Sequence, residues 1–389
     1  MVTIQTADSA LKSFYLDAVA EALDMKTNPL LAQIQRTTSG VVGKDVKKAV
    51  RLNVNGGIGA GTETGALPTA SSGDLTQFTA TLKNLYGTIE ISDKALRASA
   101  NNEGAFVNLL NDEMQSLVKS ASFNFGRMLF GDGTGKLGIV YALTSGNKIT
   151  MDSIVGVSEG MILDFYNPND QFIPEVSGAR IISLDRETKT IVVDGISLTS
   201  TLLPLGSGIY VQSSMGNEIT GIGALFSTSG TLYGVSRSRA AMKPYKKGSV
   251  GEISENVIQK AIDTIEDNSG GKVNYIVCSW GVKRALTEYY RENGIAVTTM
   301  DVDGVKAISF GGIPVVADRF CPEGTMYLLN TDDFKLHQLC DWQWLEGEDG
   351  KILKQIPGKP VYTATLVKYA ELMCERPCGQ GVLSGITEA

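Results

Sequence analysis

The chain has 389 residues and a mass of 41.5 kDa, which is enough for two or three hydrophobic cores. Hydrophobic residues make up 43% of it, so a chain that is disordered throughout is excluded. The net charge of −7 and the isoelectric point near 5.0 argue against a duplex-binding protein, because phosphate contacts need a concentrated basic face. Only 20% of the residues are charged and 43 are glycine, which is typical of a protein whose surface contacts other subunits.

The sequence favours a reducing compartment. No apolar run reaches membrane-spanning length, and the first residues lack the charged start and the apolar central region of a signal peptide. We therefore expect the protein in the cytoplasm. An odd number of cysteines without a dense framework predicts free buried thiols rather than disulfides. Cys374 and Cys378 form a single CxxxC pair, and with His337 as the one histidine we expect no metal site and no cofactor. The five cysteines are Cys278, Cys321, Cys340, Cys374 and Cys378.

The first ninety or so positions predict a helical start followed by a long hairpin. Residues 8–36 have a helical apolar pattern, and 46–54 is a strand candidate. The loop 56–73 holds mostly small residues and cannot pack on itself, and 77–92 is a second, unusually long strand. The apolar phase of that strand changes near Lys83 or Asn84, which predicts a bulge or bend. Such an arm has little core of its own and therefore needs a partner surface.

After a capped helix start at Ser92 and a break at Asn101–Asn102, the stretch from Glu103 to Phe130 predicts one long amphipathic helix. It contains no proline, and at 1.5 Å per residue its 28 residues would span roughly 42 Å, so we expect a strut that joins separate parts. Its apolar residues alternate spacings of four and three, which places them on one packed face: Phe106, Leu110, Met114, Leu117, Ala121, Phe125 and Met128.

The remainder predicts a β-rich insertion and a mixed domain, so the fold class is α+β. Short strands separated by polar turns indicate a small all-β barrel at 143–218. Two helices are expected at 255–267 and 280–293, and a long closing strand at 361–373. Further short strands are expected at 275–278, 307–310, 313–317 and 326–330.

The motifs that could carry chemistry all favour a structural interpretation. The stretch Gly131–Lys136 is similar to a phosphate-binding loop, but its glycines are one residue too close, Leu137 replaces the required hydroxyl and a helix precedes it. His337 alone cannot support a catalytic triad, and the acidic groups at 332–333 and 346–349 lie in turn-like contexts. We therefore expect no enzymatic activity.

The tryptophans Trp342 and Trp344 flank one residue and so share a strand face, which favours either core or subunit interface over a carbohydrate platform. The choice between those two remains open from the sequence.

The order of these parts resembles the major capsid protein of tailed bacteriophages, with its Hong Kong 97-like fold. The resemblance covers nearly the whole chain. It is carried by several short stretches in the same order as in that family: Tyr86–Leu96, Gly221–Phe226, Thr231–Val235, Phe310–Asp318 and Gly324–Phe334.

The resemblance implies six regions, namely an N-terminal arm (1–46), an E-loop (47–92), a peripheral domain with the spine helix (93–142), the β-rich insertion (143–218), an axial domain (219–345) and a return to the peripheral domain (346–389). It also implies hexamers and pentamers in an icosahedral head around double-stranded DNA, which the chain contacts without sequence specificity. A separate scaffolding protein, a portal and decoration proteins are expected partners, and no membrane is.

The residues expected at subunit interfaces are Gly61, Thr62, Thr64, Phe78, Leu82, Trp342 and Trp344. The alternatives are an encapsulin-type shell around enzyme cargo, which shares the fold, and a soluble enzyme with an inserted β domain.

Overall fold

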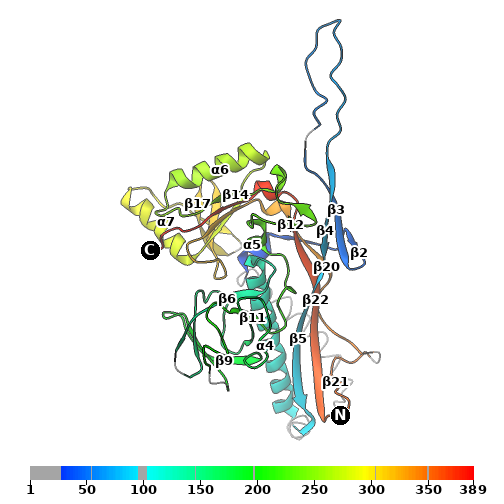
Figure 1. Cartoon of the computed structure of the whole chain (residues 1–389), viewed down its shortest axis with the longest axis vertical. Coiled ribbons are helices and arrows are strands. Elements are labelled where there is room, and N and C mark those ends of the chain that lie inside the picture. Colours follow the sequence, from blue (N-terminus) through cyan, green and yellow to red (C-terminus); the bar gives the residue numbers. More distant parts are fainter. Residues whose placement is uncertain are drawn as a thin grey trace.

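The structure is a computed structural model that describes residues 28–53, 55–94, 103–144, 146–195, 198–302, 304–347 and 350–389, with the side chains of 103–112 and 305 left out. Figure 1 shows a spine helix flanked by long strands, with a barrel beside it. A third part, made of a sheet and two helices, lies above the barrel in this view, and an arm extends away from the body. The predicted helix pattern before residue 28, the helix start that follows Ser92 and the break at Asn101–Asn102 lie largely or wholly outside the described residues.

The spine helix α4, Glu103–Phe130, has the predicted bounds. It packs against β5 (Lys83–Ser92), which pairs antiparallel with the closing strand β22 (Val361–Cys374) over ten residues. On its other edge β22 pairs with β20 (Phe334–Trp344), which in turn holds β1 (Gln35–Thr37) in parallel. With β21 (Lys354–Gln355) these strands form a five-stranded sheet. The spine helix therefore packs on a sheet whose strands come from both the N-terminal and the C-terminal parts of the chain.

The arm begins with a three-stranded sheet of β2 (Val41–Val42), β3 (Asp45–Arg51) and β4 (Leu75–Thr81). The single strand expected at 77–92 is two strands that break at Leu82, so β4 belongs to the arm and β5 to the five-stranded sheet. The change of apolar phase is the physical cause, because it lets Phe78 and Leu85 both be buried on different sheets. The predicted bend is therefore a complete transfer between sheets.

A closed barrel occupies the predicted insertion, and the small all-β barrel is confirmed. Its strand order is β10-β7-β6-β11-β8-β9, and its interior is a separate hydrophobic core. The strands begin at Lys136, ahead of the expected boundary, and end at Val211. They are β6 (Lys136–Thr144), β7 (Lys148–Met151), β8 (Ile162–Tyr166), β9 (Ala179–Asp185), β10 (Thr190–Val193) and β11 (Gly208–Val211).

A seven-stranded mixed sheet with the order β14-β23-β19-β15-β18-β17-β16 forms the third part. The helices α6 (Glu255–Ser269) and α7 (Trp280–Glu292) share a core with one of its faces. From the other face Tyr327 reaches the end of the spine helix, where its ring centroid lies 6.1 Å from that of Phe130. The strands are β14 (Tyr245–Lys247), β15 (Tyr275–Cys278), β16 (Thr299–Val302), β17 (Val305–Phe310), β18 (Ile313–Ala317), β19 (Met326–Leu329) and β23 (Gly381–Leu383).

The segment 346–389, expected to return to the peripheral region, supplies both β22 of the five-stranded sheet and β23 of the seven-stranded sheet. It therefore connects the two parts. The shorter elements are α2 (Pro29–Gln33), α5 (Ile222–Leu225), β12 (Thr231–Leu232), β13 (Val235–Ser236) and three single-turn 3-10 helices, Ala240–Met242, Thr331–Asp333 and Pro377–Gly379. Within the described ranges, the helices are all too short or too polar to cross a membrane.

Candidate assembly surfaces

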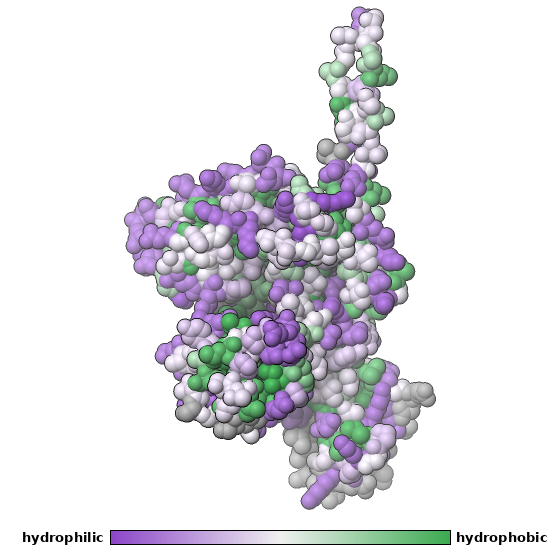
Figure 2. Space-filling model, in the orientation of Figure 1, coloured by the Kyte–Doolittle hydropathy of each residue, from purple (hydrophilic) through white to green (hydrophobic). Residues whose placement is uncertain are grey.

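The tip of the arm is exposed on all sides. Between Arg51 and Leu75 none of the described residues belongs to a helix or strand, and the expected contact residues Gly61, Thr62 and Thr64 are exposed there. Two large apolar side chains of the tip, Ile58 and Leu67, are 88% and 90% exposed. Figure 2 shows that most of the arm has intermediate hydropathy, with few strongly hydrophilic residues. Covering such a surface with another one is favourable, because apolar area is then removed from water.

The base of the arm, in contrast, is firmly packed. Phe78 is fully buried and lies 5.7 Å from the ring of Tyr233, whose carbonyl accepts a hydrogen bond from the Thr79 N–H at 3.0 Å. The Tyr233 hydroxyl donates to the Leu372 carbonyl and accepts from the Cys374 N–H, at 3.3 and 3.1 Å. Burial raises the pKa of Tyr233 well above its ordinary value, so the hydroxyl stays neutral. The arm thus extends from a rigid base.

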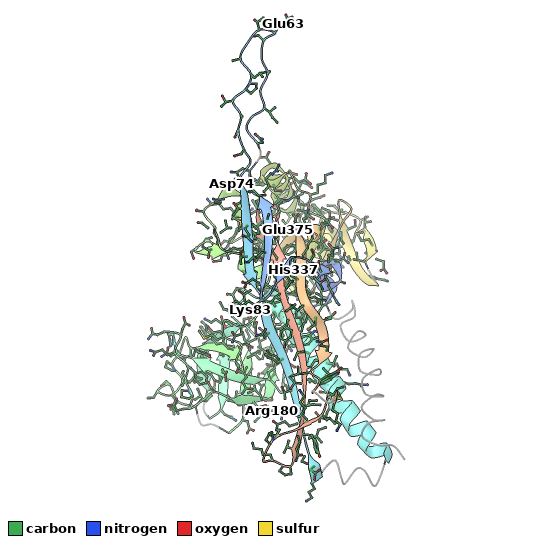
Figure 3. All side chains as sticks on the ribbon, turned by 90° about the vertical axis from the view of Figure 1, so that its right-hand side faces the viewer. Glu63, Asp74, Lys83, Arg180, His337 and Glu375 are labelled. Atoms are coloured by element: carbon green, nitrogen blue, oxygen red, sulfur yellow. The ribbon has the colours of Figure 1, made fainter. Side chains whose placement is uncertain are left out.

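Charged pairs reinforce this base. Glu375, directly after β22, pairs with Lys48 of β3 and, at 3.1 Å, with Lys335 of β20. Burial raises the pKa of Glu375, but the two lysines outweigh it and the pKa is lowered. Nearer the tip, Arg239 Nη1 lies 2.7 Å from Asp74 Oδ2. Figure 3 shows Glu63 at the tip, Asp74 where the arm leaves the body, and Glu375 within the body.

The spine residues expected on the packed face lie as follows in the structure. Met114 and Phe125 are buried, and Leu117 is half-buried against Gly87, where a Cβ would come within 3.0 Å of its Cδ1. Phe125 meets Trp342 edge to face at 6.4 Å. The side chains of Phe106 and Leu110 lie outside the described side chains.

A buried lysine lies beside this aromatic pair. Lys368 of β22 is 1% exposed, and its Nζ lies 5.3 Å from the ring centroid of Phe125 and 2.5 Å from Asp341 Oδ1. Burial lowers the pKa of Lys368, and Asp341 opposes this. Charge and aromatic contacts therefore join the spine helix to the five-stranded sheet.

Four residues expected at subunit interfaces are already packed within the chain. Phe78, Leu82, Trp342 and Trp344 are each at most 6% exposed and belong to one hydrophobic core. The sequence left core and subunit interface open for the two tryptophans, and in the structure both side chains belong to the core. Any contact of these four with another subunit stays a prediction.

The barrel joins the body through a neck, defined here as the incoming segment 131–135 and the outgoing segment 212–221. Gly133 and Gly135 have φ values of +86° and +81°, which favour glycine. A Cβ on Gly135 would lie 2.5 Å from the Ser214 carbonyl oxygen, and the Gly216 N–H donates to the Thr134 carbonyl at 2.8 Å. The glycines after the spine helix thus allow two chain segments to pack backbone to backbone.

Sequence reasoning missed the charged residues of the body that hold this neck. Arg127 interrupts the apolar face of the spine helix between Phe125 and Met128, and Glu371 interrupts the apolar run of β22. A charge within a buried pattern was the available signal, because such a group must find a buried partner. Arg127 binds Glu218 through two hydrogen bonds, and Glu371 accepts one from the Thr220 N–H.

The remaining candidates have structural surroundings. His337 lies in β20, is 2% exposed and contacts the Ser39 carbonyl oxygen through Nδ1 at 2.9 Å; burial lowers its pKa. Cys278, Cys321 and Cys374 are free and buried, and Cys340 and Cys378 are free and half-buried. In the described part of the chain, no cluster of three or more His, Cys, Asp or Glu could hold a metal ion.

The fold is the mixed α+β fold of Hong Kong 97-like capsid structures, with a small closed barrel added. The capsid protein of cyanophage A-1(L) aligns with a TM-score of 0.56 at 11% identity, over 93% of each chain. A structure from Mycobacterium phage Bobi aligns with a TM-score of 0.46 at 9% identity, over 93% of this chain and 91% of its own. The SrpI encapsulin of Synechococcus elongatus PCC 7942 aligns with a TM-score of 0.48 at 8% identity, over 92% of this chain and 86% of its own.

In sequence, the model of the SU10 major capsid protein matches residues 208–349, from β11 through β20. No curated protein sequence matches the chain. Together with the fold, this match supports the resemblance to a tailed-phage major capsid protein and a structural capsid role.

Proposed function

We propose that the chain is the shell-forming subunit of a tailed-phage head, assembling as hexamers and pentamers into an icosahedral shell around double-stranded DNA. The single observation that carries this is the arm, whose base is packed and whose tip exposes Ile58 and Leu67. An arm of this kind is stabilised by lying on a neighbour, and heterologous contacts of one subunit with the next generate closed rings.

Within the shell, we assign 47–92 to the E-loop and the tip residues Gly61, Thr62 and Thr64 to contacts between subunits. The region 143–218 would lie on the outer or lateral surface and stabilise the shell or the contacts between capsomers. Contact with DNA would be weak and independent of sequence, since the net charge of −7 suits a container better than a condenser.

Expression of the chain alone and with a candidate scaffolding protein, followed by negative-stain imaging and sedimentation, tests this proposal. Closed particles or rings of five and six subunits are the expected result. A chain that sediments as a monomer at every concentration, with and without scaffold, would overturn it. Neighbouring genes for a portal and terminase separate a phage head from an enzyme-filled compartment, which would instead neighbour a cargo enzyme.

A further inference from the structure

Two basic side chains from the body hold the outgoing segment of the barrel neck. Lys83 of β5 donates from Nζ to the Gly216 carbonyl oxygen at 2.7 Å. Arg127 of the spine helix pairs with Glu218 through two hydrogen bonds, one of them 3.0 Å, and both side chains are buried. Figure 3 places Lys83 between the upper body and the barrel.

A third group holds the same segment from the five-stranded sheet. Glu371 of β22 accepts a hydrogen bond from the Thr220 N–H to Oε1 at 2.7 Å. Its side chain is 1% exposed, and Oε2 has no hydrogen-bond partner among the described residues. Three secondary-structure elements thus each contribute one charged side chain to a segment of five residues, Gly216 to Thr220.

Glu371 is the only acidic group among these three side chains, and it is held by hydrogen bonds and not by an ion pair. Lys83 attracts it, but the ammonium group is already bonded to Gly216. The other titratable groups around it are Tyr233, which is neutral, His337 opposite it on β20, and the mutually paired Arg127 and Glu218 of the neck. Burial raises the pKa of Glu371 to about 7, against the lowering effect of hydrogen bonds from Thr220, of Lys83 and of a hydrogen bond from the Leu372 backbone.

We propose that the outgoing segment 212–221 is a strap that releases the barrel from the five-stranded sheet when Glu371 loses its proton. With a neutral carboxyl group, Oε1 accepts from Thr220 and the proton rests on Oε2. With a carboxylate, the strap encloses a buried charge that its hydrogen bonds stabilise less than water would, so opening to water becomes more favourable. This is a property of the single subunit and does not depend on assembly.

The direction and size of the effect follow from proton linkage. Glu371 has a raised pKa in the closed strap and an ordinary one when exposed, so the closed state is favoured at low pH and loses that advantage as pH rises through 7. For a pKa of about 7 when closed and an ordinary one when open, the opening equilibrium should increase about tenfold from pH 6 to pH 8.

Hydrogen–deuterium exchange of peptides covering 212–221 in the whole chain tests this, with rates corrected for the intrinsic pH dependence of exchange. The wild-type strap should lose about tenfold protection between pH 6 and pH 8, while β8 and β9 inside the barrel stay protected. Glu371→Gln keeps the oxygen that accepts from Thr220 and should abolish the pH dependence. Glu375→Gln, one position beyond the end of β22 and paired with lysines, should leave it intact.

A wild-type strap whose protection is the same at both pH values would overturn the proposal, and so would a Glu371→Gln strap that keeps the full dependence. If Glu371→Gln does not fold, the wild-type comparison still decides. As a second variant, Lys83→Met removes another tie and should raise exchange of the strap at both pH values. Strap exchange in that variant that matches the wild type at both pH values would contradict the assignment of this segment as a strap held by the body.

Discussion

Arg127 and Glu218 form a buried, doubly hydrogen-bonded ion pair between residues 91 positions apart. Arg127 belongs to the last turn of the spine helix, and Glu218 to the segment by which the chain leaves the barrel. The pair therefore fixes the barrel to the spine. Taking two charges out of water is costly, and their attraction offsets this only while both are present.

Glu218→Ala should lower the free energy of unfolding by about 3–5 kcal/mol, because it leaves the Arg127 guanidinium buried without its carboxylate. Urea unfolding monitored by tryptophan fluorescence measures this. The control is Asp74→Ala, which removes the half-exposed pair with Arg239 and should cost about 1 kcal/mol or less. Equal losses in the two variants would show that the buried pair does not hold the neck.

The arm tip separates folding from assembly. Replacing Ile58 and Leu67 by serine should leave the free energy of unfolding within about 0.5 kcal/mol, since both side chains are almost fully exposed in the subunit. Particle yield should fall, because these side chains are the apolar surface that a neighbour would cover. Leu339→Ser is a matched control on β20, where the side chain is 56% exposed. Normal particle yield from the double variant would refute this role of the tip.

A charge introduced on the packed face of the spine helix should be more damaging at position 114 than at position 117. Met114→Asp places a carboxylate where the side chain is fully buried and should prevent folding or assembly. Leu117→Asp affects a half-buried position beside Gly87 and should be the milder of the two. Soluble yield, circular dichroism and particle counts rank the two variants. If Leu117→Asp were the more severe, the buried face would be rotated from the one described.

Local patterns in the sequence predicted much of the fold. The spine helix, the barrel, α6, α7 and the closing strand each carry their own periodicity or turn residues, which act over a few positions. The transfer of the chain between sheets at Leu82 was visible only as a change of phase near Lys83. Which sheet each half would join depends on partners hundreds of residues away, such as the pairing of Lys83 with Ala370.

The neck was beyond sequence reasoning for the same reason. The glycines at 131–135 read correctly as a helix stop, but the backbone that they approach, near Ser214, follows the last barrel strand and so lies at the other end of the insertion in sequence. Arg127 and Glu371 were individually conspicuous as charges in apolar runs, while their partners Glu218 and Thr220 lie in a polar loop without periodicity. The partner of a buried charge is set by tertiary packing, which a single sequence does not reveal.

Asp318 provides a second pH dependence, in the turn that follows β18. It is 2% exposed, its Oδ1 accepts the Phe320 N–H at 2.9 Å, and burial raises its pKa to about 6 despite that bond and Arg319. A carboxyl group whose pKa is higher in the folded state stabilises the fold at pH values below its pKa in the unfolded chain. This contribution is lost as pH rises through 6.

The wild-type chain should therefore lose about 2 kcal/mol relative to Asp318→Asn between pH 4 and pH 8, since one pKa unit corresponds to about 1.4 kcal/mol. Asparagine keeps an oxygen for the Phe320 N–H but cannot ionise. Denaturant midpoints at several pH values measure the difference, with the exposed Asp332→Asn as the control that should follow the wild type. Identical pH courses for the wild type and Asp318→Asn would mean that Asp318 ionises as readily folded as unfolded, so that its burial does not affect stability.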